Sequence, residues 1–418
     1  MKIRLPRLLA VLPFGVAALL ASCATPESRV VVGPRGAQPD IRVGLAVGVS
    51  QVVIGGGGAL AVLGADTTVR AEVPAGSSLT IVERGGGLGV SGALSWFLPA
   101  GEPLSVAPIG ADGFVRVAGK DYRGRVSVFS ARGALTVVNQ LGLENYLAGV
   151  VSAEMGRRDS SEVQALYAQA VISRTYALRN RRRWDAVGFD FYATVADQVY
   201  GGVSAERPQG WEAVNGTAGM AVTWQGQPID GFFFSTCGGK TANGTEVFAN
   251  ADRPYLVSID DIDENGVAYC RISPRYEWRA EWSVEALRDI LRESVPATLG
   301  ASISSHAVIQ SVEVVERSRS DRVARLTLTI DGREIAVNGA AVRQVLRPAR
   351  GELLRSSVFT LSQNRNAGRV VRLVAEGRGA GHGVGFCQWG AVGRARAGQG
   401  YRQILAAYFP DTDLERIY

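Results

Sequence analysis

The sequence has little excess charge and very few histidines. Its 418 residues carry 45 basic and 39 acidic side chains, with two histidines and three methionines. Residues 1–22 contain three of the basic side chains, so the remainder has 42 basic and 39 acidic side chains and a net charge of +3. Nucleic acids require a strongly basic surface, and so we expect no nucleic acid among the partners.

Long hydrophobic runs are also lacking. The run from Leu8 to Leu20 is too short for a comfortable membrane-spanning helix, and basic residues precede it while small residues and Cys23 follow. This order is typical of a bacterial lipoprotein signal. We expect a signal peptide over residues 1–22 and a lipid on Cys23 that attaches the protein to a membrane. Ala24, where an Asp would favour the inner membrane, indicates a periplasm-facing lipoprotein of a Gram-negative outer membrane.

Residues 41–121 have no helical periodicity. Short runs with alternating apolar side chains lie between clusters of glycine, of which the chain has 51. This pattern is typical of strands joined by tight turns. We predict a β-rich N-terminal subdomain over residues 41–121. Residues 23–40, which contain proline and glycine but no periodic pattern, are predicted to be a flexible tether.

Two helices are predicted next, because apolar side chains begin to recur three and four residues apart. One runs from Leu143 to about Met155, and a longer amphipathic helix runs from a cap near Asp159 to about Arg181. Arg174 lies on the apolar face of the second helix. A buried guanidinium requires a carboxylate or several carbonyl partners, so Arg174 either forms a structural ion pair or orients a carboxylate in a cleft.

The rest of the chain mixes helices and strands. Residues 282–346 are predicted to form a smaller αβ subdomain, and two short helices are expected at residues 388–397 and 401–408. The predicted fold class is therefore α+β. It combines mixed β-sheets, a few packed helices, the β-rich N-terminal subdomain and the smaller inserted αβ unit.

Three separated blocks of the sequence carry a specific signature. They comprise residues Glu144 to Met155 with Ala168 to Leu178, residues Ser235 to Thr241 with Pro254 to Leu256, and residues Gly381 to Ala391. Together, and in this order, they resemble the sporulation stage II protein D family, which also includes the amidase enhancer LytB. The resemblance implies one catalytic domain of this kind over residues 122–418.

This resemblance implies a peptidoglycan lytic transglycosylase, which cleaves the bond between MurNAc and GlcNAc in glycan strands. It maps the catalytic glutamate onto Glu154. A single carboxyl group suffices and no cofactor is required, because the C6 hydroxyl of the substrate closes a 1,6-anhydro ring, whereas hydrolases use a second carboxylate. The resemblance further implies a preference for strands that an amidase has freed of stem peptides.

Glu154 also suits this role by its position. It is predicted to lie at the C-terminal end of an apolar helix, where the negative end of the helix dipole and nearby apolar atoms raise the pKa of a carboxyl group. A raised pKa keeps a general acid protonated near neutral pH. The alternative is an ordinary exposed glutamate in a loop.

Further residues in or near the three blocks are candidates for binding substrate or supporting Glu154. His382 stands in a glycine-rich loop and either hydrogen-bonds to the sugar or Glu154, or makes a structural bond in a turn. Gln388 follows in the same block. Tyr146 and Tyr200 either stack on sugar faces or pack in the core.

Three cysteines remain after Cys23, and an oxidising compartment favours their pairing. We prefer a disulfide between Cys237 and Cys270, with Cys387 as a buried thiol. The alternative is a zinc site formed by the three cysteines and His382. Several members of the family have a histidine where this chain has Phe234, so a histidine-containing metal site does not transfer directly.

Two other functions stay open. A glycan-binding protein without activity of its own would stimulate an amidase partner, as the resemblance to LytB allows. A muramidase that uses water would need a second carboxylate, for which Asp197 or Asp260 is a candidate.

Overall fold

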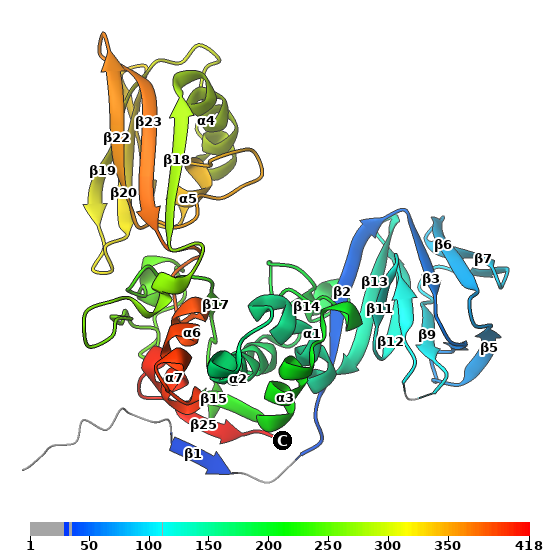
Figure 1. Ribbon diagram of the computed structural model, residues 1–418. Coiled ribbons are helices and arrows are strands. Elements are labelled where there is room, and N and C mark those ends of the chain that lie inside the picture. Colours follow the sequence, from blue (N-terminus) through cyan, green and yellow to red (C-terminus); the bar gives the residue numbers. More distant parts are fainter. Residues whose placement is uncertain (1–28, 33–35, 111) are drawn as a thin grey trace, which may run out of the picture.

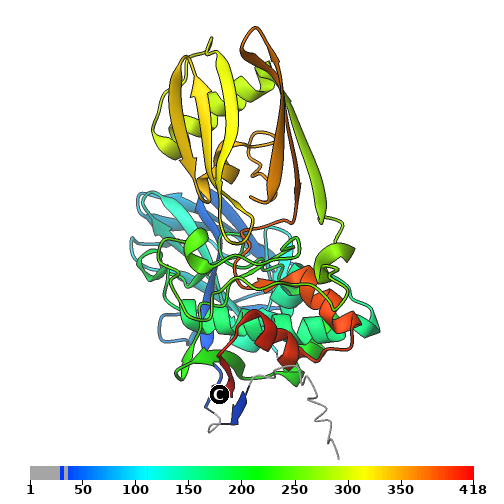
Figure 2. The ribbon, with the colours of Figure 1, turned by 90° about the vertical axis from the view of Figure 1, so that its left-hand side faces the viewer.

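Figure 1 shows the computed structural model, which describes residues 29–32, 36–110 and 112–418. Cys23 and the predicted signal peptide lie outside the described residues. The chain forms a β-rich N-terminal part, a helical core and an inserted unit of sheet and helix that stands on the core (Figure 2). This architecture confirms the predicted α+β class.

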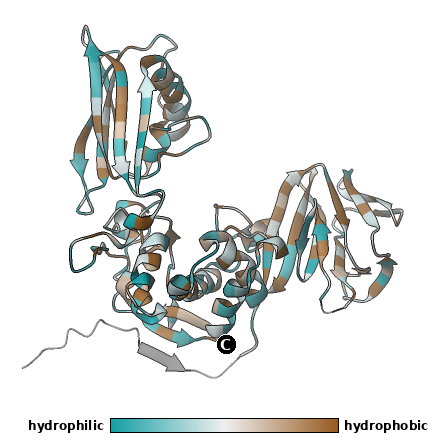
Figure 3. Cartoon of the chain, viewed as in Figure 1, coloured by the Kyte–Doolittle hydropathy of each residue, from teal (hydrophilic) through white to brown (hydrophobic). Residues whose placement is uncertain are grey.

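The N-terminal part consists of two facing sheets. The seven-stranded sheet has the order β14-β2-β13-β12-β9-β4-β5, and the six-stranded sheet has the order β11-β10-β3-β6-β7-β8. Alternate side chains point between the sheets, as Val126 and Val128 do, which gives the alternating colours along the strands in Figure 3. The strands are β2 Asp40–Val49, β3 Gln51–Gly55, β4 Leu60–Leu63, β5 Val69–Val73, β6 Ser78–Arg84, β7 Gly87–Gly92, β8 Trp96–Leu98, β9 Leu104–Pro108, β10 Val115–Val117, β11 Lys120–Tyr122, β12 Arg125–Ala131, β13 Ala134–Gly142 and β14 Phe191–Tyr192.

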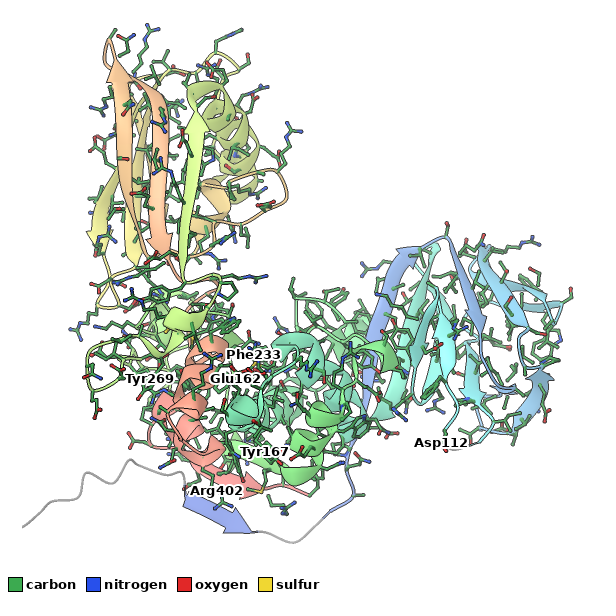
Figure 4. The ribbon with its side chains drawn as sticks, viewed as in Figure 1. Asp112, Glu162, Tyr167, Phe233, Tyr269 and Arg402 are labelled. Atoms are coloured by element: carbon green, nitrogen blue, oxygen red, sulfur yellow. The ribbon has the colours of Figure 1, made fainter. Side chains whose placement is uncertain are left out.

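The helical core begins where β13 ends. Helix α1 (Leu143–Met155) has the predicted bounds, and α2 (Val163–Asn180) ends one residue before the predicted Arg181. A short 3-10 helix precedes α2, and a capping box between Asp159 and Glu162 fixes its start. Glu162, labelled in Figure 4, also pairs with Arg396 and so joins the start of α2 to the C-terminal segment.

Arg174 of α2 is completely buried and forms a bidentate ion pair with Glu144 of α1. Its Nε lies 2.9 Å from Oε1 of Glu144 and its Nη2 lies 2.6 Å from Oε2. The remaining N–H groups donate to the carbonyls of Val214 and Met220 and to the hydroxyl of Thr217. Every side of the guanidinium is therefore satisfied, and Arg174 has the structural role that was one of our two expectations.

A four-stranded sheet packs against α2 through its strand β15 and has the order β1-β25-β15-β16. Residues 29–32 belong to it, which corrects the predicted tether over residues 23–40. They form a strand because the edge of β25 offers unpaired backbone groups, with which β1 pairs in parallel. The strands are β1 Arg29–Val32, β15 Met220–Trp224, β16 Gln227–Pro228 and β25 Asp413–Arg416.

The inserted unit has a hydrophobic core of its own, which includes Trp282, Leu291 and Leu373. It contains two three-stranded sheets, β18-β23-β22 and β19-β20-β21, and reaches beyond residues 282–346 because β18 pairs with the distant β23. Its elements are β18 Glu277–Ser283, α4 Val284–Leu299, β19 Ile309–Arg317, β20 Val323–Ile330, β21 Arg333–Asn338, α5 Ala341–Val345, β22 Phe359–Asn366 and β23 Arg369–Arg378.

After the insert the chain returns to the core. Strand β24 (Phe386–Cys387) pairs in parallel with β17 (Phe233–Phe234), and α3 (Pro208–Gly216) packs against α1 and α2 on the other side of the core. The two predicted C-terminal helices are confirmed as α6 (Gln388–Arg396) and α7 (Tyr401–Tyr408). Among the described residues, no helix combines the length and the apolar character that a membrane span requires.

The buried ion pair generates a prediction for stability. Replacing Arg174 with alanine should lower the free energy of unfolding by about 3–5 kcal/mol, because the Glu144 carboxylate then loses its partner inside the protein. Urea denaturation measures the change. The matched control is Arg179→Ala on the same helix, whose ion pair with Asp230 is more exposed and should contribute less than about 1 kcal/mol. Equal losses in the two variants would contradict the structural role of Arg174.

Candidate functional site

Glu154 lies in the last turn of α1 and is half-buried. Its Oε1 accepts a hydrogen bond from the backbone N–H of Val199 at 2.9 Å, and its Oε2 accepts one from Nε2 of Gln388 at 3.2 Å. Gly156 ends the helix with a φ of 65°, a conformation that favours glycine. The carboxyl group is therefore held between two uncharged donors at a helix end.

The surroundings of Glu154 raise the pKa of its carboxyl group. Burial is the largest cause, because it disfavours the charged form, while the hydrogen bonds from Val199 and Gln388 act in the opposite direction. No arginine or lysine pairs with Glu154 in the described part of the chain. A carboxyl group of this kind can hold a proton to higher pH than an exposed glutamate.

Gln388 is the first residue of α6 and is nearly buried. Besides Glu154, its amide nitrogen contacts Oε1 of Gln169 at 3.4 Å, and Gln169 in turn donates to Ser173 on the next turn of α2. The expected proximity of Gln388 to Glu154 is thus present. The side-chain amides of Gln169 on α2 and Gln388 on α6 thus form a chain of contacts that orients the Glu154 carboxyl group.

Tyr146 and Tyr200 belong to the core and do not face a sugar. Tyr146 is completely buried and donates to Gln198, while Tyr200 donates to Asn139. Their rings contact each other, with centroids 5.1 Å apart. Of the two alternatives, packing in the core is therefore the one that the structure has for both tyrosines. They support the helix that carries Glu154.

His382 is also a structural residue. Its Nδ1 accepts from the backbone N–H of Val384 at 3.1 Å, and its Nε2 lies 2.9 Å from the carbonyl oxygen of Phe233. These partners fix the neutral ring with a proton on Nε2, and burial lowers its pKa to about 4. Both ring nitrogens are engaged with backbone, so the expected hydrogen bond to Glu154 is absent from the described structure.

Neither candidate for a second carboxylate is suited to activate water beside Glu154. The carboxylate of Asp197 is buried and accepts hydrogen bonds from Tyr176, Trp184 and the backbone of Tyr192. Asp260 is largely exposed and lies near a lysine. Asp197 therefore has a structural role, and Asp260 lies at the surface.

The three cysteines converge with Asp261 in the core below the insert. The four possible ligand atoms of Cys237, Cys270, Cys387 and Asp261 all lie within 4.8 Å of one another, and all four residues are buried. The cluster could hold a metal ion. His382, the possible fourth ligand of the alternative zinc site, is not part of it, because its ring nitrogens bind backbone.

The preferred disulfide is not formed in this structure. The sulfur atoms of Cys237 and Cys270 are 3.4 Å apart, whereas an S–S bond is about 2.05 Å long. The three cysteines are free thiols that surround a common point. Pairing any two of them would remove two of the four convergent ligand atoms.

The chemistry of the cluster fits a thiolate-binding metal. Backbone N–H groups of Cys237 and Gly390 point to the sulfur of Cys387, and that of Gly239 points to the sulfur of Cys237. Hydrogen bonds from Cys237 and Cys387 and from backbone lower the pKa of Cys270, whereas burial raises the pKa of Cys237 and of Cys387, so these two thiols would lose their protons only on binding a metal. Such donors stabilise negatively charged sulfur, and three thiolates with one carboxylate form a four-ligand set that Zn²⁺ accepts.

Asp261 is the functional candidate that the sequence did not indicate. Its carboxylate accepts from Nε of Arg394 and from the hydroxyl of Tyr408, both at 2.9 Å. Arg394 in turn lies over the ring of Tyr269, which Figure 4 labels beside α6. No local pattern distinguishes Asp261 from its neighbour Asp260, since only the folded chain brings it to the cysteines.

The raised pKa of Glu154 predicts a pH-dependent effect on stability. Because the folded protein holds this proton more tightly than the unfolded chain does, wild-type stability should fall as the pH rises above about 4.5. Glu154→Gln, which cannot ionise, should have a melting temperature similar to wild type at pH 4 and a higher one at pH 8. Thermal unfolding at both pH values measures this.

The exposed Glu264 supplies the control for that comparison. Glu264→Gln should change the melting temperature by the same small amount at pH 4 and pH 8. A Glu154→Gln variant that is less stable than wild type at pH 8 would contradict the assigned environment of Glu154.

Comparisons with known proteins agree with this arrangement. A family model described as stage II sporulation protein matches residues 131–224, which include Glu154 and Arg174. A second model, a domain of unknown function, matches residues 268–385 and so covers the inserted unit.

Three relatives extend the similarity to most of the chain. An uncharacterized protein of Brachyspira hyodysenteriae is 31% identical over 305 residues, which are 72% of this chain and 74% of the relative. Stage II sporulation protein D of Bacillus subtilis is 28% identical over 69% of this chain and 79% of its own length. The amidase enhancer of Bacillus subtilis is 27% identical over 64% of this chain but only 40% of its own length. The chain therefore belongs to the stage II sporulation protein D family, whose cell-wall proteins include the amidase enhancer.

Proposed function

We propose that the protein is a peptidoglycan lytic transglycosylase that cleaves peptide-free glycan strands between MurNAc and GlcNAc. The observation that carries this proposal is Glu154. It is a half-buried carboxyl group with a raised pKa, held by uncharged donors, and neither Asp197 nor Asp260 is suited to act as a second carboxylate. This is the arrangement that a reaction with one acid–base group requires.

In the proposed reaction, Glu154 first donates its proton to the glycosidic oxygen. The bond between C1 of MurNAc and this oxygen breaks, and GlcNAc leaves with a new hydroxyl group. The C6 hydroxyl of the same MurNAc then attacks C1 and gives its proton to the Glu154 carboxylate. A 1,6-anhydro ring forms, no water is consumed, and Glu154 is again protonated for the next cycle.

Gln388 suits both protonation states of Glu154. An amide has one acceptor and one donor end, so the side chain can donate to the carboxylate or, after rotating, accept from the carboxylic acid. A lysine or arginine at this place would stabilise only the carboxylate and would lower its pKa. The uncharged Gln388 is therefore compatible with both the protonated and the ionised form of Glu154, which must act first as an acid and then as a base.

We also propose that Zn²⁺ occupies the cluster of Cys237, Asp261, Cys270 and Cys387. Bound there, the ion would supply a structural crosslink, because four protein ligands leave it no open position. The cluster joins the segment after β17, the segment before the insert and the start of α6. It would thereby fix the position of Gln388, which directly follows Cys387.

For its location, we propose a lipoprotein anchored through Cys23 to the outer membrane and facing the periplasm. This rests on the signal and lipobox pattern of residues 1–23. Peptidoglycan lies within reach of that location, and an amidase that removes stem peptides would supply the peptide-free strands.

A second function is favoured by the similarity to the amidase enhancer. The protein would then bind glycan and stimulate an amidase without cleaving the glycan itself. Product analysis separates the possibilities, because a transglycosylase leaves anhydro ends, a muramidase leaves reducing ends and a binding protein leaves neither.

The catalytic role predicts the effect of Glu154→Gln. The amide keeps the shape of the side chain but cannot donate a proton, so the release of anhydro-MurNAc should fall by about 100- to 10,000-fold. Mass spectrometry of products from purified peptide-free glycan measures the release. Glu264→Gln again serves as the control and should keep wild-type activity. Cleavage by Glu154→Gln within a few-fold of wild type would show that another group is the acid.

The metal proposal predicts about one zinc ion per chain, measured by elemental analysis of the purified protein. Cys387→Ala should lose the metal and lower the melting temperature. His382→Asn should keep the metal, since His382 lies outside the cluster. A protein without zinc in which mass spectrometry finds a bond between Cys237 and Cys270 would refute the metal site in favour of the disulfide.

A further inference from the structure

A cavity of about 400 Å³ lies between the insert and the core. Its wall combines the loop around Phe248 and the residue His382 from the core with residues of β20 and α5 from the insert. The carbonyl of Phe233, which Figure 4 labels in the core, contacts His382. The size falls within the range of small-ligand sites, about 300–1,000 Å³.

Arg322 lines this cavity and is only 4% exposed. Its Nη2 makes one long hydrogen bond, 3.4 Å, to the carbonyl of Lys240, while its buried Nη1 has no hydrogen-bond partner among the described residues. The guanidinium also lies against the backbone of Gly383, where an added Cβ would come within 2.2 Å of Nη2. A buried cationic N–H without a partner is costly, so this group requires an acceptor.

Arg343 lines the same cavity from α5. Its Nε donates to the carbonyl of Leu354 at 2.7 Å, and it forms no ion pair with a carboxylate in the described structure. Burial and the charge of Arg322 lower the pKa of Arg343 to about 10. Two arginines with buried or half-buried side chains thus line one cavity, and the charge of each raises the electrostatic cost of the other.

The one acidic side chain of the cavity wall does not offset both charges. Glu246 accepts hydrogen bonds from Asn243, Ser318 and Ser320, and it forms no ion pair with either arginine. The wall contains two arginines and one glutamate, while His382 is neutral. The formal charge of the lining is therefore +1, which one singly charged anion would neutralise.

We propose that this cavity is an oxyanion site in which Arg322 and Arg343 bind the carboxylate of a peptide-free MurNAc residue. The proposal rests on the proposed function and adds to it the group that distinguishes the substrate. MurNAc carries a lactyl group whose carboxyl is joined to the stem peptide, and removal of the peptide leaves a free carboxylate. Guanidinium groups bind carboxylates through paired, charge-assisted hydrogen bonds.

The same cavity explains why a stem peptide would be rejected. An amide at the lactyl group has no negative charge, so the two guanidinium groups would remain without an anion. The cavity would also have to admit the peptide chain that continues from this amide. A monoanionic carboxylate matches the lining charge better than a phosphate monoester, which carries a charge of about −1.5 to −2 at pH 7.

Binding to the Glu154→Gln protein tests the proposal without cleavage. The probes are a peptide-free GlcNAc–MurNAc tetrasaccharide and the same compound with its lactyl carboxylates capped as methyl amides, measured by calorimetry. Capping should weaken binding by about tenfold or more, and Arg343→Gln or Arg322→Gln should remove this difference. The control Arg333→Gln, at an exposed position of the insert, should preserve it. Should Arg322→Gln fail to fold, Arg343→Gln retains the test.

Equal binding of the free and capped probes, or no binding of either, would overturn the proposal. Inorganic phosphate serves as a further probe. Phosphate binding that depends on Arg343, together with no effect of capping, would assign the site to another anion and overturn the glycan assignment. Release of anhydro ends by the protein with Glu154 intact is measured separately, so the proposed function can hold while this inference fails.

Discussion

The ion pair between Arg174 and Glu144 is the contact on which the helical core depends. It joins the middle of α2 to the start of α1, and the carbonyls of Val214 and Met220 add the end of α3 and the start of β15. The hydroxyl of Tyr418 also donates to Glu144, so the end of the sequence is tied to the same point. Since α1 has only 13 residues, fixing its first turn also fixes its last turn, where Glu154 lies.

The residues that hold the backbone around the candidate site differ from Glu154, the residue proposed to act on a substrate. Arg174, Tyr146 and Tyr200 are buried with their polar atoms engaged, and they hold α1 and the N-terminal sheet in place. His382 is half-buried, and its two ring nitrogens bind backbone groups that fix the glycine-rich loop. Glu154 is only half-buried and has uncharged partners. Of the candidate site residues, Arg174, Tyr146, Tyr200 and His382 thus maintain the geometry around Glu154.

The sequence predicted those features that depend on neighbouring residues. Helices α1 and α7 have the expected ends because their apolar spacing and flanking glycines are local signals. The pairing of β1 with β25, the strands β18 and β23 of the insert, and the approach of Asp261 to the cysteines all join distant segments. For His382, the sequence indicated a special position but not its partners, which are backbone groups that only the fold brings together.

The two ends of the insert lie side by side, since Glu277 at the start of β18 is paired with Arg378 at the end of β23. A unit whose entry and exit are adjacent can be gained, lost or exchanged in evolution without moving the chain on either side of it. Arg322 and Arg343 belong to this unit, whereas Glu154 belongs to the core. Selection can therefore change the anion site proposed for Arg322 and Arg343 while the residue proposed to break the bond stays the same.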